Sequence, residues 1–187
     1  RYTAGGTTAG SATLVNTTTS GNQRFPDVAM KSTGEFMVVW MDDAKDSDGW
    51  SICYRKFSSA GGAVSDELNL ATADTRQKKF PRVTISGNDA AYYVTWATTG
   101  SDYGIRAAKV TSESGAGTVT ATDVVTASSF FVNNPVIGAD QDGNTVIAWQ
   151  YFGAAGYSDI KGRRYNSSWV LQDSEFTANT DDSNHQT

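Results

Sequence analysis

A repeat of about 54 residues runs through the chain and constrains its fold more than any local motif does. Three prolines, spaced 55 and 54 residues apart, each open an apolar run: Pro26, Pro81 and Pro135. A tryptophan closes the following apolar run each time, and these residues are Trp40, Trp96 and Trp149. Internal periods of this size are typical of propeller blades and solenoids, so the sequence predicts successive copies of one small structural unit.

Each repeat contains four short segments with strand character. In the first repeat they span residues 25–31, 35–41, 51–57 and 63–70, and the last of them has the weakest pattern. Turn residues such as Ser32-Thr33-Gly34 lie between them, where glycine and asparagine supply the positive φ angles of tight hairpins. The predicted fold class is all-β: tandem four-stranded antiparallel blades of a β-propeller, with three complete repeats and partial blades at both ends.

The repeat also divides the chain. We expect residues 1–14 to end a preceding blade, residues 15–68, 69–123 and 124–176 to form three blades, and residues 177–187 to begin a further one. Propellers typically close with four to eight blades. We therefore expect further blades, from the same or another chain, to complete the structure.

Composition and charge exclude several classes of function. The net charge of -5 argues against binding to nucleic acid, which requires an extended basic face. No apolar run approaches the eighteen or so residues of a membrane helix, so no membrane span is predicted. One cysteine and one histidine are too few for a zinc site. Few cysteines and much threonine and glycine suit a secreted or cell-surface protein.

The order of segments resembles a known group of propellers. A proline-led strand, a glycine turn, a strand ending in tryptophan and a strand closed by Arg55-Lys56-Phe57 resemble the sialidase-like propellers with Asp-box repeats. Such repeats also occur in arrays of secreted bacterial surface proteins. The Asp box would fall at residues 58–64, 112–119 and 166–170, and its aspartate is absent from all three. The resemblance therefore implies the fold rather than the sialidase reaction.

An aromatic residue stands near an acidic one in the loop before the third strand of every repeat. Sugar rings stack on aromatic faces while carboxylates accept bonds from their hydroxyls, and loops of one kind share one face of a propeller. The alternative is that these aromatics only cap the gap between neighbouring blades. The predicted ligand-binding residues are Trp50, Asp48, Tyr103, Asp102, Tyr157 and Asp159.

Four aspartates crowd the loop after Trp40: Asp42, Asp43, Asp46 and Asp48. Calcium is the metal that such a set of carboxylates would take. Ala44 stands where a calcium loop needs an acid, however, and this favours the alternative of a solvated loop with no cofactor.

The sequence thus predicts a non-catalytic, secreted or surface propeller module that binds glycan or protein, or serves in display. It indicates no catalytic residue. Two alternatives remain open. One is part of a sialidase-like glycoside hydrolase whose catalytic residues lie outside this sequence. The other is a structural subunit that self-associates through open strand edges.

Overall fold

The computed structural model describes residues 1–47, 49–70, 75–100, 103–111, 115, 117, 119–127, 131–153 and 156–180, and only the backbone of Asp46 and Ala127. Over these ranges the chain forms strands and turns, and none of it is a helix that could cross a membrane.

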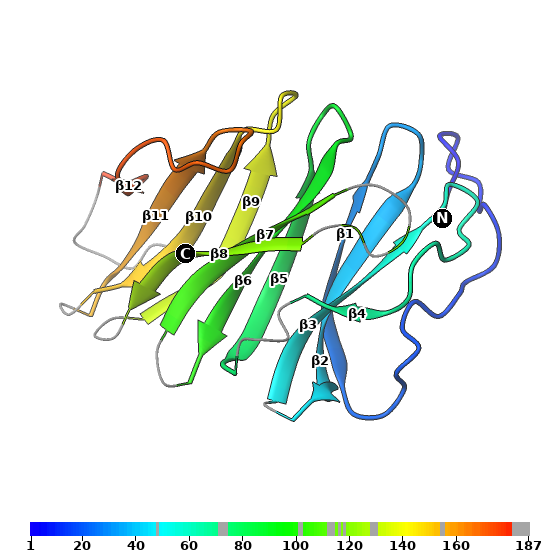
Figure 1. Ribbon diagram of the computed structural model, residues 1–187, viewed down its shortest axis with the longest axis horizontal. Coiled ribbons are helices and arrows are strands. Elements are labelled where there is room, and N and C mark those ends of the chain that lie inside the picture. The colour runs from blue at the N-terminus through cyan, green and yellow to red at the C-terminus, as the bar shows by residue number, and fades with distance from the viewer. Residues whose placement is uncertain are drawn as a thin grey trace.

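The described strands form three antiparallel sheets of four strands each. The first sheet contains β1 (Gln23–Met30), β2 (Phe36–Asp46), β3 (Gly49–Phe57) and β4 (Leu68–Asn69). The second contains β5 (Gln77–Ile85), β6 (Ala91–Thr99), β7 (Tyr103–Thr111) and β8 (Val119–Ala127). The third contains β9 (Phe131–Ala139), β10 (Thr145–Phe152), β11 (Ser158–Tyr165) and β12 (Phe176–Thr177). The sheets lie side by side as successive blades, and the predicted all-β propeller class is confirmed (Figure 1).

The first strand of each sheet lies on the inside of the array, since β1 contacts β5 and β5 contacts β9. We call β1, β5 and β9 the inner strands, and the three sheets blades 1, 2 and 3. The fourth strand is shorter than the sequence suggested in blade 1, where residues 63–70 form one bridge at Ala63 and the two-residue strand β4. The division of the chain at residues 68, 123 and 176 stays a prediction.

The periodic tryptophans are buried at equivalent places, as the repeat requires. Their exposed fractions are 4% for Trp40, 0% for Trp96 and 1% for Trp149. Trp96 packs into a core shared with β2 of blade 1, and Trp149 packs into a core shared with β7 of blade 2. Trp96 and Trp149 therefore face the preceding blade. Strand β6 is buried on both of its faces because blade 2 lies between the other two.

The turn after the third strand repeats in fine detail, including at the start of the chain. A bridge closes this turn three times, at Tyr2 with Thr8, at Phe57 with Ala63 and at Tyr165 with Leu171. Residues 1–9 thus reproduce the geometry of the third-to-fourth-strand turn of blades 1 and 3.

Three basic side chains reach the blade that follows them in the chain. Lys56 Nζ donates to the Thr111 carbonyl oxygen over 2.7 Å, and Lys109 Nζ donates to the Ser167 carbonyl oxygen over 3.1 Å. Arg1 makes the same kind of contact with the Ser59 carbonyl oxygen. We call these residues the joint cations.

Candidate binding face

One edge of the array collects the loops that the sequence analysis singled out. Antiparallel pairing puts the start of each inner strand beside the end of the second strand: Gln23 opposite Asp42, Gln77 opposite Thr99, and Phe131 opposite Phe152. The second-to-third-strand hairpins end at the same edge, which lies at the bottom of Figure 1. We call this edge the candidate face.

Each inner strand has a β-bulge near the candidate face, at the residue before its proline. Pairing with the second strand shifts register there in all three blades. The residues involved have positive φ angles of 53° at Phe25, 57° at Phe80 and 48° at Asn134. Such backbone is strained for a residue with a side chain, and proline restricts the residue before it further. Strain of this kind, together with bulges that redirect side chains, concentrates at functional sites.

Trp50 lies at the candidate face between blades 1 and 2. The Arg24 guanidinium carbon is 5.7 Å from the centre of the indole ring, and Arg24 itself is exposed. The Trp50 backbone nitrogen donates to Gln77 Oε1 of the next inner strand over 3.1 Å. The ring is partly buried against the core shared by the two blades. Trp50 therefore combines a contact to the next blade with a half-open aromatic surface beside a cation and an amide.

Tyr103 occupies the corresponding place between blades 2 and 3. Its ring centre is 4.5 Å from that of Phe131, the first residue of β9, and Phe131 is 5.6 Å from Phe152. If these aromatics only cap the gap between neighbouring blades, contacts of this kind are expected, and Trp50 also contacts the next blade. They do not exclude binding, because Tyr103 is only partly buried.

The third predicted aromatic does not match the other two in register. Strand pairing aligns Ser158, not Tyr157, with Trp50 and Tyr103, since each of these residues stands two before the isoleucine of its third strand. Tyr157 is 45% exposed. Asp159 follows it and accepts a bond from Asn179 Nδ2 at 3.0 Å. Two predicted partners, Asp48 and Asp102, lie outside the described residues.

The aspartate loop after Trp40 differs from the solvated loop that the sequence favoured. Strand β2 continues through it to Asp46, and Asp42 is fully buried. Asp42 and Asp43 are consecutive on this strand, so their side chains point to opposite faces. Asp43 accepts the Asn22 backbone and side-chain nitrogens at 2.6 and 2.8 Å, and these bonds lower the pKa of its carboxyl. Asp48 and the Asp46 side chain lie outside the description.

Asp42 instead gathers with Cys53 and Glu67, whose potential ligand atoms all lie within 4.8 Å of one another. The Glu67 carboxylate already accepts bonds from Thr17 and Thr18, and from Lys45 Nζ at 3.0 Å. A hard cation such as calcium prefers oxygen ligands without an ammonium group beside them. The cluster therefore fits a structural role, in which Glu67 holds Thr17 and Thr18 to blade 1, better than it fits a calcium site.

The structure also shows site residues that the sequence analysis missed. Arg24, Lys79 and Asn133 occupy equivalent inner-strand positions, two residues before each proline, beside the bulges. Asn133 Oδ1 is buried and accepts no hydrogen bond within the described part of the chain. A polar residue at this fixed offset from every proline was the available signal.

Comparison with known proteins supports the architecture. No family model and no curated protein matches the sequence. The fold is similar to that of an alpha-L-arabinofuranosidase from Lactobacillus brevis, with TM-score 0.59 and 10% identity over 85% of this chain and 57% of that one. It is also similar to an endo-arabinase from Bacteroides thetaiotaomicron, with TM-score 0.53 and 17% identity over 91% of this chain and 67% of that one. At these identities the likeness shows the fold alone. The sialidase-like part of the sequence resemblance is not shown.

Proposed function

We propose that this chain is a non-catalytic β-propeller module, secreted or displayed at the cell surface, that binds glycan at the candidate face. The observation that carries the proposal is the half-open Trp50 ring with the Arg24 guanidinium over it, together with the Gln77 side-chain amide that binds the Trp50 backbone nitrogen. Sugars are bound by aromatic faces flanked by planar hydrogen-bonding groups. The repeated bulges and the polar residues before them add support from all three blades.

The two similar structures suggest which glycans to try first. Their names describe enzymes that act on arabinose-containing substrates, an alpha-L-arabinofuranosidase and an endo-arabinase. We therefore take arabinan and arabino-oligosaccharides as the first probes of the candidate face, with unrelated glycans as comparisons.

The inner strands favour binding over hydrolysis. Glycoside hydrolysis uses two carboxylates placed on either side of the scissile bond. Of the three inner strands only β1 carries an acid, Asp27, whose two oxygens accept the Val28 and Val83 backbone nitrogens at 3.0 and 2.9 Å. A carboxylate committed to two backbone donors in a blade joint is poorly placed to act as an acid or a nucleophile.

A glycoside hydrolase remains the second candidate because both similar structures carry names of that class. Incubation with arabinan and detection of released reducing ends separates the two proposals. Binding without release of sugar is the expected result, and steady turnover would replace our proposal with the second one.

The binding experiment compares Arg24→Ala and Trp50→Ala with two exposed control variants, Arg164→Ala and Tyr2→Ala. Loss of a well-packed contact at a binding site typically costs about 1–3 kcal/mol, so each test variant should bind arabino-oligosaccharide roughly tenfold more weakly or worse. The controls change side chains of the same types away from the face, at exposed fractions of 58% and 74%, and should bind normally. Unchanged binding by Arg24→Ala and Trp50→Ala would refute the site.

A further inference from the structure

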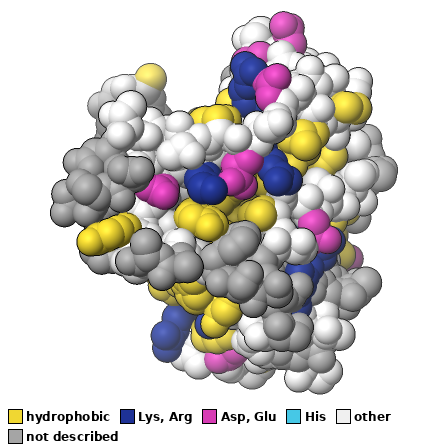
Figure 2. Space-filling model, turned by 90° about the vertical axis from the view of Figure 1, so that its left-hand side faces the viewer, with side chains coloured by type: hydrophobic (Ala, Val, Ile, Leu, Met, Phe, Trp, Pro, Cys, Tyr) yellow, Lys and Arg dark blue, Asp and Glu magenta, His cyan; other side chains and the backbone are white. Residues whose placement is uncertain are grey.

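The outer face of the blade 3 sheet is open to solvent, whereas the next blade covers the equivalent faces of blades 1 and 2. Val146 stands three residues before Trp149, as Met37 and Tyr93 stand before their tryptophans. Met37 is 0% and Tyr93 2% exposed, because the next blade covers each of them, whereas Val146 is 43% exposed. Figure 2 shows this side of the molecule, with hydrophobic side chains beside basic and acidic ones.

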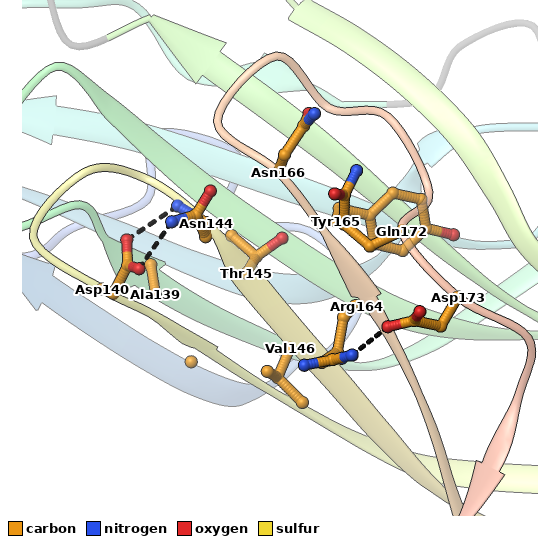
Figure 3. Close-up of a pocket in the computed structure, with 11 residues that line it drawn as sticks. Ala139, Asp140, Asn144, Thr145, Val146, Arg164, Tyr165, Asn166, Gln172 and Asp173 are labelled. Atoms are coloured by element: carbon orange, nitrogen blue, oxygen red, sulfur yellow. Dashed lines mark hydrogen bonds and ion pairs between the residues drawn. The ribbon is translucent and has the colours of Figure 1, made fainter.

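A hollow of about 740 Å³ lies on the same face, lined in part by Asp140, Val146, Arg164 and Asp173. In Figure 3 the Val146 side chain lies close to the Arg164 guanidinium, which pairs with the Asp173 carboxylate of its own blade. The Arg164 side chain remains 58% exposed despite this pair.

Arg164 continues the series of joint cations. Each member stands directly before an equivalent position of the repeat: Arg1 before Tyr2, Lys56 before Phe57, Lys109 before Val110, and Arg164 before Tyr165. The first three donate to a carbonyl oxygen of the next blade, which lies in the third-to-fourth-strand turn for Arg1 and Lys109 and at the last residue of β7 for Lys56. Arg164 holds the fourth position and faces the open side.

We infer that the open face of blade 3 is a docking surface for a further four-stranded blade of the same repeat type. The occupant presents its tryptophan-bearing face to Val136 and Val146, as blades 2 and 3 do to the blades before them. The carbonyl groups of its third-to-fourth-strand turn accept bonds from Arg164, which leaves Asp173 or shares its donors with it. The surface is thus continuous with the two internal blade interfaces of the chain.

A second copy of this chain fits the surface less well. Its blade 1 would have to offer the Ser59 carbonyl oxygen to Arg164, and Arg1 of the same chain already donates to that oxygen. Residues 1–9 also fold as a third-to-fourth-strand turn beside blade 1, in the place that blade 3 of another copy would need.

The test supplies the occupant directly, as an added repeat. Thr177 pairs with Lys161 in blade 3 as Asp123 pairs with Arg106 in blade 2, so Thr177 and Asp123 are equivalent positions of the repeat. A second copy of residues 124–187, placed directly after Thr177, therefore keeps the repeat in register. The probe of the surface is Val146→Cys, labelled with a thiol reagent in the parent and in the extended chain. Cys53 is buried and gives a low background, and Val28→Cys, at a 57% exposed position on β1, is the control.

Labelling at Val146→Cys should slow at least about tenfold in the extended chain, because a covered site reacts only when the joint opens. Adding Arg164→Ala should raise the labelling rate of Val146→Cys in the extended chain about tenfold, as expected for loss of a charged hydrogen bond. The same change should leave the parent unaffected, and Val28→Cys should label equally in both chains.

Three results would overturn the inference. Val146→Cys could label at the parent's rate in the extended chain, which includes the case where the added repeat does not fold. Arg164→Ala could have no effect on labelling in the extended chain. Sedimentation could show that the parent is a dimer whose Val146→Cys is protected, in which case the face belongs to a second copy. None of these results depends on glycan binding.

Discussion

At the scale of single residues, the three periodic tryptophans stabilise the blades through buried area rather than through hydrogen bonds. In the part of the chain that the structure describes, the indole nitrogens of Trp40, Trp96 and Trp149 have no hydrogen-bond partner. The same condition recurs at equivalent sites, so it belongs to the repeat. Large aromatic side chains dominate core energetics through the area that they bury.

Replacing Trp96 with alanine should therefore lower the free energy of unfolding by about 3–5 kcal/mol, through lost burial and the cavity left behind. Trp96→Phe should lower the free energy of unfolding clearly less, because it keeps an aromatic ring. The indole N–H that it removes has no hydrogen-bond partner among the described residues. Equilibrium unfolding in urea measures both changes. A phenylalanine variant as unstable as the alanine variant would show that the indole N–H has a partner of consequence.

Glu67 gives stability a defined dependence on pH. Burial by itself raises the pKa of its carboxyl, but the Thr18 side chain, the Thr17 and Thr18 amides and Lys45 outweigh it and lower the pKa to about 2 from 4.5. The folded state thus prefers the ionised form. This contribution to stability is present above pH 4.5 and is lost as the pH falls towards 2.

Unfolding midpoints measured between pH 7 and pH 2 test this. The parent should lose stability steeply below about pH 4.5, whereas Glu67→Gln should be less stable at pH 7 and decline less steeply. Glu35→Gln is the comparison variant: the Lys31 ammonium also lowers the pKa of the Glu35 carboxyl, but solvent screens this surface pair, so the change should alter the pH curve less than Glu67→Gln does. Parallel pH curves for the parent and Glu67→Gln would contradict the assigned role.

At the scale of elements, the joints between blades depend on close backbone approach as well as on side chains. Gly87, in the first hairpin of blade 2, donates its N–H to the Asp140 carbonyl oxygen of blade 3 over 3.0 Å. A Cβ at this position would lie 2.8 Å from Gln141 Cα and would also meet the Gln141 side chain. The hairpins of blades 2 and 3 thus touch at a point that only glycine fits.

Gly87→Ala should lower stability by roughly 1–3 kcal/mol, the usual cost of overpacking, because backbone must move to relieve the contact. The matched control is Gly138→Ala, in β9, where an added Cβ meets no atom within 4 Å. Thermal melts of the two variants should differ clearly. Equal melting temperatures would mean that the hairpins of blades 2 and 3 can move apart at Gly87 without loss of stability.

The sequence predicted the sheets well because proline and tryptophan mark the same strand positions in every repeat. It predicted the loops less well, for local reasons. Asp42 looked solvated because its neighbours are charged, yet β2 runs on past the tryptophan and buries it. Tyr157 looked equivalent to Trp50 because it is an aromatic near an acid before the third strand. It stands three residues before Ile160, however, whereas Trp50 stands two before Ile52, and strand pairing places Ser158 in that register. The bulges before the prolines could not be predicted, because the residue types at these positions do not differ from those of a regular strand.

At the scale of the whole molecule, the three blades lie side by side, with contacts between successive inner strands and the candidate face at one edge (Figure 1). The candidate face and the open face of blade 3 are different surfaces, so glycan binding and docking of a further blade can be tested separately. The proposed function depends on glycan binding at Trp50.

Titration of arabino-oligosaccharide into the labelled protein, followed by NMR of the five tryptophan indole N–H groups, tests that claim most directly. Three of these groups are buried in the blades, and Trp169 stacks on Tyr93 and Tyr165 away from the candidate face. We expect the Trp50 signal, assigned with Trp50→Phe, to shift in a saturable way while the other four stay in place and the oligosaccharide remains intact. A Trp50 signal that does not shift, or cleavage of the oligosaccharide, would contradict non-catalytic glycan binding at Trp50.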